Sequence, residues 1–184
     1  MPNIIHKSGR LDKTDLVFEH SPDPAFMAVL DMAAYESFLP GWDWPSLTLK
    51  VARQMSQERI FAWGCPELEV QVRITMTSPT HAGFQPAESI SGFLVTDGRL
   101  GFTSYDNITY CTQFEGKHFP LHEDRPLLVS PDRYQIVVHR MFQWRHGHQF
   151  PDAIVDGDHY VIVLTLADGS TPPKRFDCVP WVVL

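Results

Sequence analysis

Histidine is the residue type that first suggests chemistry in this sequence. The chain contains nine histidines, and His139, His146 and His148 lie close together with Asp152 shortly after them. In an extended segment His146 and His148 would point to the same side, where a third nitrogen or oxygen ligand could complete a metal site. Their spacing matches no established metal-binding signature. We therefore expect no metal or other cofactor, and we keep a histidine-based site as the alternative.

Other catalytic patterns are missing from the sequence. It contains no nucleophile elbow, no Walker A motif and no Rossmann glycine pattern. Cys65 could pair with a histidine as a nucleophile, but we interpret it as a structural residue at the entrance of a strand. The three cysteines, Cys65, Cys111 and Cys178, are too few and too widely spaced for a disulfide framework. We expect buried, reduced cysteines and a protein that is not an enzyme.

The charge of the chain is negative and unevenly distributed. The formal net charge is −7, which argues against direct nucleic-acid binding because that function needs a basic face. Two long intervals contain carboxylates but no lysine or arginine. The first, between Lys13 and Lys50, holds Asp15, Glu19, Asp23, Asp31, Glu36 and Asp43, and the second, between Arg145 and Lys174, holds Asp152, Asp156, Asp158 and Asp168. Such runs are either solvated faces or surfaces that steer a basic partner.

A turn rich in aromatic residues lies near the end of the first acidic interval. Trp42 and Trp44 flank Asp43, and they could belong to a core cluster or serve as aromatic anchors of an acidic interface. The candidate partner-binding residues are Asp31, Glu36, Trp42, Asp43 and Trp44.

The clearest structural element is a strand that begins at Leu68. Leu68, Val70, Val72, Ile74 and Met76 alternate with polar residues, which gives one apolar row and one wet row because successive strand side chains point to opposite faces. Such a strand needs a second apolar layer against its dry face.

The rest of the chain adds strands, turns and one helix. A helix is expected over Ser46–Ile60, with Ser46 as its N-cap. Asp97-Gly98 predicts a hairpin turn between strands Ser89–Thr96 and Arg99–Tyr105. The preferred partner of the Leu68 strand is the strand Tyr134–Trp144. Residues 25–39 fit either a helix or a strand, and we favour a strand at Phe26–Met32. Further strands are expected at Asp15–His20 and Asn107–Phe114, and a closing hairpin is expected from Tyr160–Leu166 and Phe176–Leu184.

These elements predict an all-β, mostly antiparallel fold: a β-sandwich of about seven or eight strands with one short helix. We expect one domain over residues 1–184, of which residues 1–13 are mobile. No run of about 18 apolar residues appears, and the N-terminus lacks the features of a signal peptide. We therefore expect a cytoplasmic protein with no membrane partner.

The order of several short motifs resembles the competence protein J family of small acidic nuclease inhibitors. These motifs are the Trp42-Asp43-Trp44 turn before a helix, Phe61-Ala62-Trp63, the Leu68 strand, and Pro131 ahead of Tyr134. The resemblance covers residues 25–142 and implies a cytoplasmic, non-enzymatic protein that binds a basic nuclease or toxin. The leading hypothesis is thus an inhibitor or immunity protein. The alternative is a small β-sandwich enzyme or ligand carrier with a histidine-based site.

Overall fold

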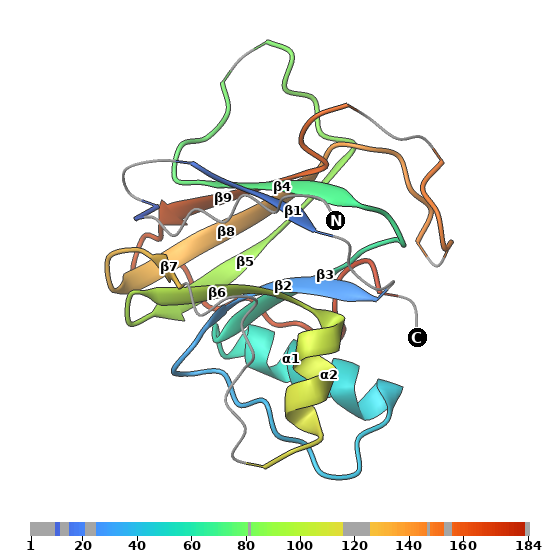
Figure 1. The fold of residues 1–184 in the computed structure, drawn as a ribbon. Helices are drawn as coiled ribbons and strands as arrows, with labels where there is room; N and C mark the ends of the chain where they lie inside the picture. The colour runs from blue at the N-terminus through green and yellow to red at the C-terminus, as the bar shows by residue number, and fades with distance from the viewer. Residues whose placement is uncertain are drawn as a thin grey trace.

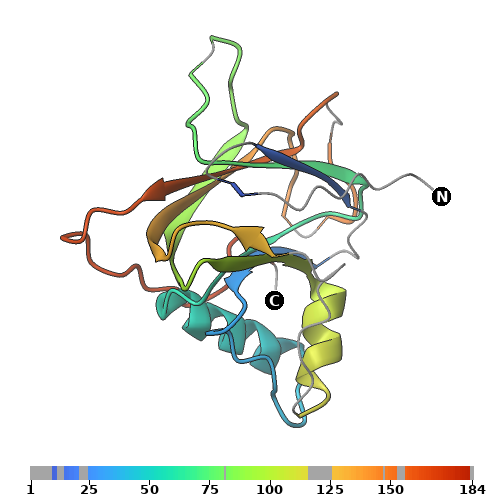
Figure 2. The same cartoon turned by 60° about the vertical axis from the view of Figure 1, so that its left-hand side comes forward.

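The computed structural model describes residues 10–11, 15–20, 25–80, 82–115, 126–146, 148–152 and 156–182. Two β-sheets lie one above the other, and two helices cover the outer face of one of them (Figure 1). The same layers are visible in the turned view of Figure 2. The prediction of a mostly antiparallel β-protein is confirmed, but the described part of the chain has nine strands and two helices where seven or eight strands and one helix were expected.

The larger sheet has five strands in the order β1-β4-β9-β8-β5. Their bounds are β1 Leu16–His20, β4 Val70–Thr75, β9 Tyr160–Leu166, β8 Asp132–Arg140 and β5 Glu88–Thr96. The alternating strand is confirmed, since Val70, Val72 and Ile74 are buried while Gln71 and Arg73 are half-buried. Its predicted pairing with β8 is wrong, because β9 lies between them and pairs in parallel with β4.

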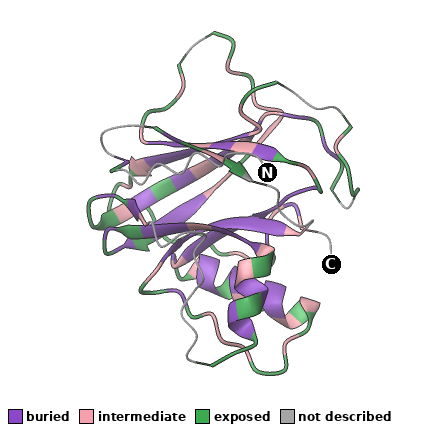
Figure 3. Cartoon of the chain, in the orientation of Figure 1, coloured by how far each residue is buried: buried purple, intermediate pink, exposed green. Residues whose placement is uncertain are grey.

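The smaller sheet has four strands in the order β3-β2-β6-β7. Their bounds are β3 Ile60–Gly64, β2 Phe26–Asp31, β6 Arg99–Ser104 and β7 Leu127–Leu128. Every residue of β2 and β3 is buried, because one face packs on the five-stranded sheet and the other under the helices (Figure 3). A strand covered on both faces has no polar row, which explains why the sequence of β2 fits a helix equally well.

Helix α1 spans Trp44–Ser56 and begins earlier than predicted. Asp43 is its N-cap: the Asp43 carboxylate accepts the Ser46 N–H at 2.8 Å, and the Ser46 hydroxyl oxygen accepts the Asp43 N–H at 2.8 Å. This capping box satisfies two backbone donors that have no partner within the helix. Ser46 is therefore the third helical residue and not the cap.

Helix α2 spans Tyr105–Thr112, so the strand predicted at Asn107–Phe114 is wrong. Ile108, Cys111 and Thr112 are buried at helical spacing, which places them on one stripe of the helix. Ile108 and Thr112 are four residues apart, a spacing that an alternating strand shares with a helix. No helix in the described residues is long and apolar enough to span a membrane.

Two further pairings differ from the predictions. The Asp97-Gly98 turn is present, with Gly98 at φ 108°, but β5 pairs with β8 and β6 pairs with β2. The turn therefore carries the chain from one sheet to the other. The described part of the predicted last strand, residues 176–182, contains no strand. There Trp181 has φ 63°, and the Pro180 carbonyl accepts the Gly64 N–H at 2.8 Å.

The prediction that residues 1–13 are mobile falls mostly outside the described residues. Within that segment Leu11 is buried, and its N–H donates to the Leu128 carbonyl at 2.9 Å.

Candidate functional site

Asp31, the first of the predicted partner-binding carboxylates, lies inside the protein. Its side chain is 1% exposed, and it accepts backbone N–H groups from Ala33 at 3.0 Å, Ala34 at 2.7 Å and Asp97 at 3.0 Å. Three such bonds stabilise the carboxylate and fix the turn after β2 against the turn after β5. Asp31 therefore organises the backbone at this end of the molecule.

Glu36 and Asp43 are exposed, but each has a positive partner within the chain. Glu36 Oε1 accepts from Arg59 Nη1 at 2.5 Å. Asp43 caps α1, and its hydrogen bonds with Ser46 lower the pKa of its carboxyl group. The positive end of the helix dipole offsets part of the Asp43 charge. The negative field of these two residues is thus partly balanced where it arises.

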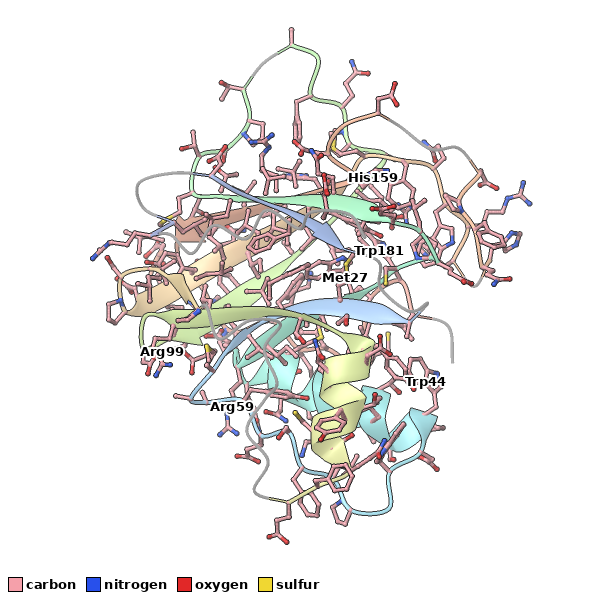
Figure 4. The ribbon with its side chains drawn as sticks, viewed as in Figure 1. Met27, Trp44, Arg59, Arg99, His159 and Trp181 are labelled. Carbon is pink, nitrogen blue, oxygen red and sulfur yellow. The ribbon has the colours of Figure 1, made fainter. Side chains whose placement is uncertain are left out.

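Trp44, one of the two tryptophans of the predicted site, links the N-terminal ends of the two helices. The rings of Trp44 and Tyr105 meet edge to face at 5.4 Å, and both pack on Phe26 at 6.1 and 5.6 Å. Trp44 is labelled at the start of α1 in Figure 4. We call Trp42, Asp43, Trp44, Tyr105 and Asp106 the helix-end surface. Tyr105 and Asp106 were not predicted as site residues because their neighbourhood was expected to be a strand.

A second group of carboxylates gathers on the outer face of the five-stranded sheet. The register places Val17 opposite Arg73 and Glu19 opposite Gln71, so the wet rows of β1 and β4 form one surface. Glu69 precedes β4 in the same alternation. Asp158 lies just before β9, where it accepts from Arg73 Nε at 2.6 Å and from Gln71 Nε2 at 2.7 Å.

Arg73 is the centre of this group. Its Nη1 also lies 3.4 Å from Asp15 Oδ2, and the hydrogen bond with Asp158 raises the pKa of its guanidinium. Asp156 is exposed two residues before Asp158. We call the group Asp15, Glu19, Glu69, Asp156 and Asp158 the acidic sheet face. Arg73 pairs with Asp15 and Asp158, while Glu19, Glu69 and Asp156 are exposed, so the group as a whole carries an excess of negative charge.

The acidic sheet face borders a hollow of about 420 Å³. It is lined by Asp15, Arg73 and Asp158 together with Phe84. Its lining also includes the hydroxyl-bearing residues Thr75 at the end of β4 and Thr77, Ser78 and Thr80 after it. The hollow can admit a side chain of a bound protein next to the ion pair.

The three histidines of the alternative site have different neighbours. His139 Nδ1 lies 2.8 Å from Ser89 Oγ, His146 Nε2 lies 3.3 Å from Glu88 Oε2, and the His148 carbonyl accepts the Trp144 indole N–H. The described residues contain no group of three His, Cys, Asp or Glu side chains that could hold a metal ion.

The cysteines follow the prediction in part. Burial raises the pKa of Cys65 to about 12 and that of Cys111 to about 11, so both thiols stay protonated near neutral pH. Cys178 is exposed, and the prediction that it is buried is wrong.

No protein-family model and no curated protein matches this chain. Among solved structures it is similar to the protein described as crocagin biosynthetic gene J, with a TM-score of 0.52 and 17% identity over 84% of this chain and 99% of that one. It also resembles ComJ from Bacillus subtilis, described as an inhibitor of the DNA degrading activity of NucA, with a TM-score of 0.44 and 11% identity over 84% of this chain and 96% of that one.

The predicted resemblance to the competence protein J family is thereby confirmed as a weak one. At such low identity the likeness to the first structure concerns the fold, and function has to be argued from the surface of this chain.

Proposed function

We propose that this protein is a non-enzymatic inhibitor or immunity protein that occupies a basic surface of a nuclease or toxin in the cytoplasm. The partner role follows the family resemblance in the sequence, and ComJ, the more distant of the two structures, is described as inhibiting a nuclease. The argument for the role in this chain comes from its own charges.

One observation carries the proposal: carboxylates from both base-free intervals meet on one sheet face. Asp15 and Glu19 come from the first interval, and Asp156 and Asp158 come from the second. The pairing of β1 with β4 and the Arg73–Asp158 bond bring them together. A nuclease surface that holds nucleic-acid phosphates is rich in lysine and arginine, so a cluster of carboxylates complements it.

The helix-end surface is the alternative contact with the same partner. Its Trp44–Tyr105 pair suits an aromatic anchor. We favour the acidic sheet face because the exposed carboxylates Glu36 and Asp43 are balanced by Arg59 and by the end of α1.

Two matched charge reversals test the proposal. Glu19→Lys/Glu69→Lys alters the acidic sheet face, whereas Glu36→Lys/Glu115→Lys changes the net charge equally in the helix layer. Degradation of plasmid DNA by a lysate of the source cells is measured with each purified protein added. We expect the wild type and the helix-layer variant to slow degradation, and the sheet-face variant to need at least about tenfold more protein.

Two outcomes would contradict it. Loss of inhibition in the helix-layer variant alone would indicate that the nuclease contacts the helix layer instead of the acidic sheet face. No inhibition by the wild-type protein at any concentration would show that a nuclease is not the partner.

A further inference from the structure

A groove of opposite charge lies between α1 and the segment that follows β9. It has a volume of about 590 Å³. The helix side contributes Leu49, Arg53, Ser56 and Gln57, and the facing side consists of residues 173–177. Since α1 covers the four-stranded sheet, the groove is separate from the acidic sheet face on the outer side of the other sheet (Figure 1).

The facing wall is fixed to the helix and to the core. Ser56 Oγ accepts the Phe176 N–H at 2.8 Å, and its single proton lies within reach of the Ala52 carbonyl at 3.1 Å and the Phe176 carbonyl at 3.3 Å. The Phe176 ring meets the buried ring of Phe61 edge to face at 5.8 Å. The wall therefore holds its position without a ligand, which lowers the entropic cost of binding.

The groove concentrates positive charge in a chain of net charge −7. Arg53, Lys174 and Arg175 line it, and Asp177 is its one carboxylate. The Arg175–Asp177 ion pair is 3.5 Å long, with side chains 89% and 87% exposed, so solvent screens it and an incoming carboxylate can replace Asp177.

Apolar groups lie beside these cations. Leu49 is 45% exposed on the outer face of α1, one turn before Arg53 on the same stripe. Phe176 is half-buried, and Lys174 Nζ lies 5.3 Å from its ring centroid. A ligand that fits the groove combines carboxylates with an aliphatic side chain.

We propose that this groove binds an acidic segment of a partner protein, whose carboxylates pair with Arg53 and Arg175 while an aliphatic side chain covers Leu49. The inference is independent of the proposed inhibitory function. A nucleic acid fits less well, because three cations interrupted by Asp177 do not follow a phosphate backbone. A second copy of the chain is disfavoured by repulsion between two molecules of charge −7.

Titrations followed by the backbone amide NMR signals of the full chain test this inference. The probes are a pentapeptide of alternating glutamate and leucine, the same peptide with glutamine for glutamate, and a short oligothymidylate. We expect the glutamate peptide to shift the signals of Arg53, Gln57, Lys174 and Arg175. The glutamine peptide and the oligonucleotide should leave these signals in place.

Matched variants locate the site. Arg53→Glu/Arg175→Glu should lower the affinity for the glutamate peptide by at least about tenfold. Arg99→Glu/Arg145→Glu makes the same charge change outside the groove and should bind like the wild type, and thermal melts check that both variants fold. Equal shifts from the glutamine peptide, stronger binding of the oligonucleotide, no shift at these four residues, or equal weakening by both variants would overturn the proposal.

Discussion

Arg140 shows how a single buried charge can organise its surroundings. Its side chain is 3% exposed, and its Nη2 donates to Glu88 Oε2 at 2.7 Å. The guanidinium lies over the ring of Trp181 at 4.8 Å, and the Trp181 indole N–H donates to the other Glu88 oxygen at 2.8 Å. A buried arginine is tolerated only when its charge and donors are satisfied. This cluster therefore anchors residues near the C-terminal end of the chain to the five-stranded sheet.

His146 belongs to the same cluster and so has a structural explanation. Its Nε2 lies 3.2 Å from Arg140 Nη1 and 3.3 Å from Glu88 Oε2. Its ring also meets Trp144 edge to face at 5.4 Å. The histidine that suggested metal binding in the sequence is held here by its contact with the Arg140 guanidinium and by the ring of Trp144.

His159 should make stability depend on pH. Its Nδ1 accepts the Gln71 N–H at 3.0 Å, so Nε2 carries the proton of the neutral ring. Protonation would add a hydrogen to Nδ1 and break the bond with Gln71. Burial lowers the pKa of His159, and Asp158 raises it in part. The unfolded chain, with a histidine pKa of about 6.5, takes up the proton first as pH falls. The free energy of unfolding should therefore fall as pH drops below that value.

His159→Asn tests this dependence because an asparagine side-chain oxygen can still accept the Gln71 N–H. Urea unfolding at pH 7.5 and 5.5 gives the loss of stability for each protein. We expect a smaller loss in the variant than in the wild type. His139, whose pKa is also lowered by burial, remains in both proteins and cancels in the comparison. Equal losses would show that His159 does not control the pH response.

At the scale of elements, the two faces of β4 should respond differently to substitution. Val72 is fully buried, whereas the Arg73 side chain is 35% exposed. Val72→Asp places an unpaired carboxylate in the core, at a cost of several kcal/mol, comparable to the whole stability of a domain. Arg73→Gln removes a partly exposed ion pair and should cost about 1 kcal/mol or less. Thermal melts of the two variants check this. Similar melting temperatures would contradict the assignment of the faces.

The sequence was informative about elements that show a clear period and less so elsewhere. The alternation from Leu68 identifies β4 and the residues of β4 that face solvent. Residues 105–112 carry apolar side chains at spacings that fit both a strand and a helix, and packing on the four-stranded sheet decides for α2. Asp97-Gly98 predicts the turn correctly but not its neighbours, because strand pairing depends on residues distant in the chain.

The same reasoning applies to the candidate site. The sequence locates the two acidic intervals, but only the pairing of β1 with β4 and the bond between Arg73 and Asp158 bring them onto one face. Conversely, Asp31 looks like any other carboxylate of its interval. Its burial follows from the three backbone donors that surround it in the folded chain.

At the scale of the whole molecule, the acidic sheet face and the basic groove occupy different layers. The acidic sheet face lies on the outer side of the five-stranded sheet, and the basic groove lies beside α1 in the helix layer. Figure 4 places Arg59 and Arg99 at the end of the molecule away from Trp44. Such a distribution orients an approaching charged protein before contact, because the field extends beyond the surface while its sign differs between faces.

Association with a basic partner should therefore depend strongly on salt. Ions screen charges beyond about 8 Å near physiological ionic strength, so the association rate constant of the wild type should fall as sodium chloride is raised. In Glu19→Lys/Glu69→Lys the association rate constant should be lower at low salt and nearly independent of salt, because these substitutions remove the long-range electrostatic attraction of the partner. The dissociation rate should change less, because Glu19 and Glu69 are exposed and contribute little to the desolvated part of an interface.

Both rates can be measured on surface-immobilised partner that has been purified through its binding to the wild-type protein. A salt dependence that is the same for wild type and variant would exclude the acidic sheet face as the steering surface. Faster dissociation of Trp44→Ala alone would then point to the helix-end surface as the contact.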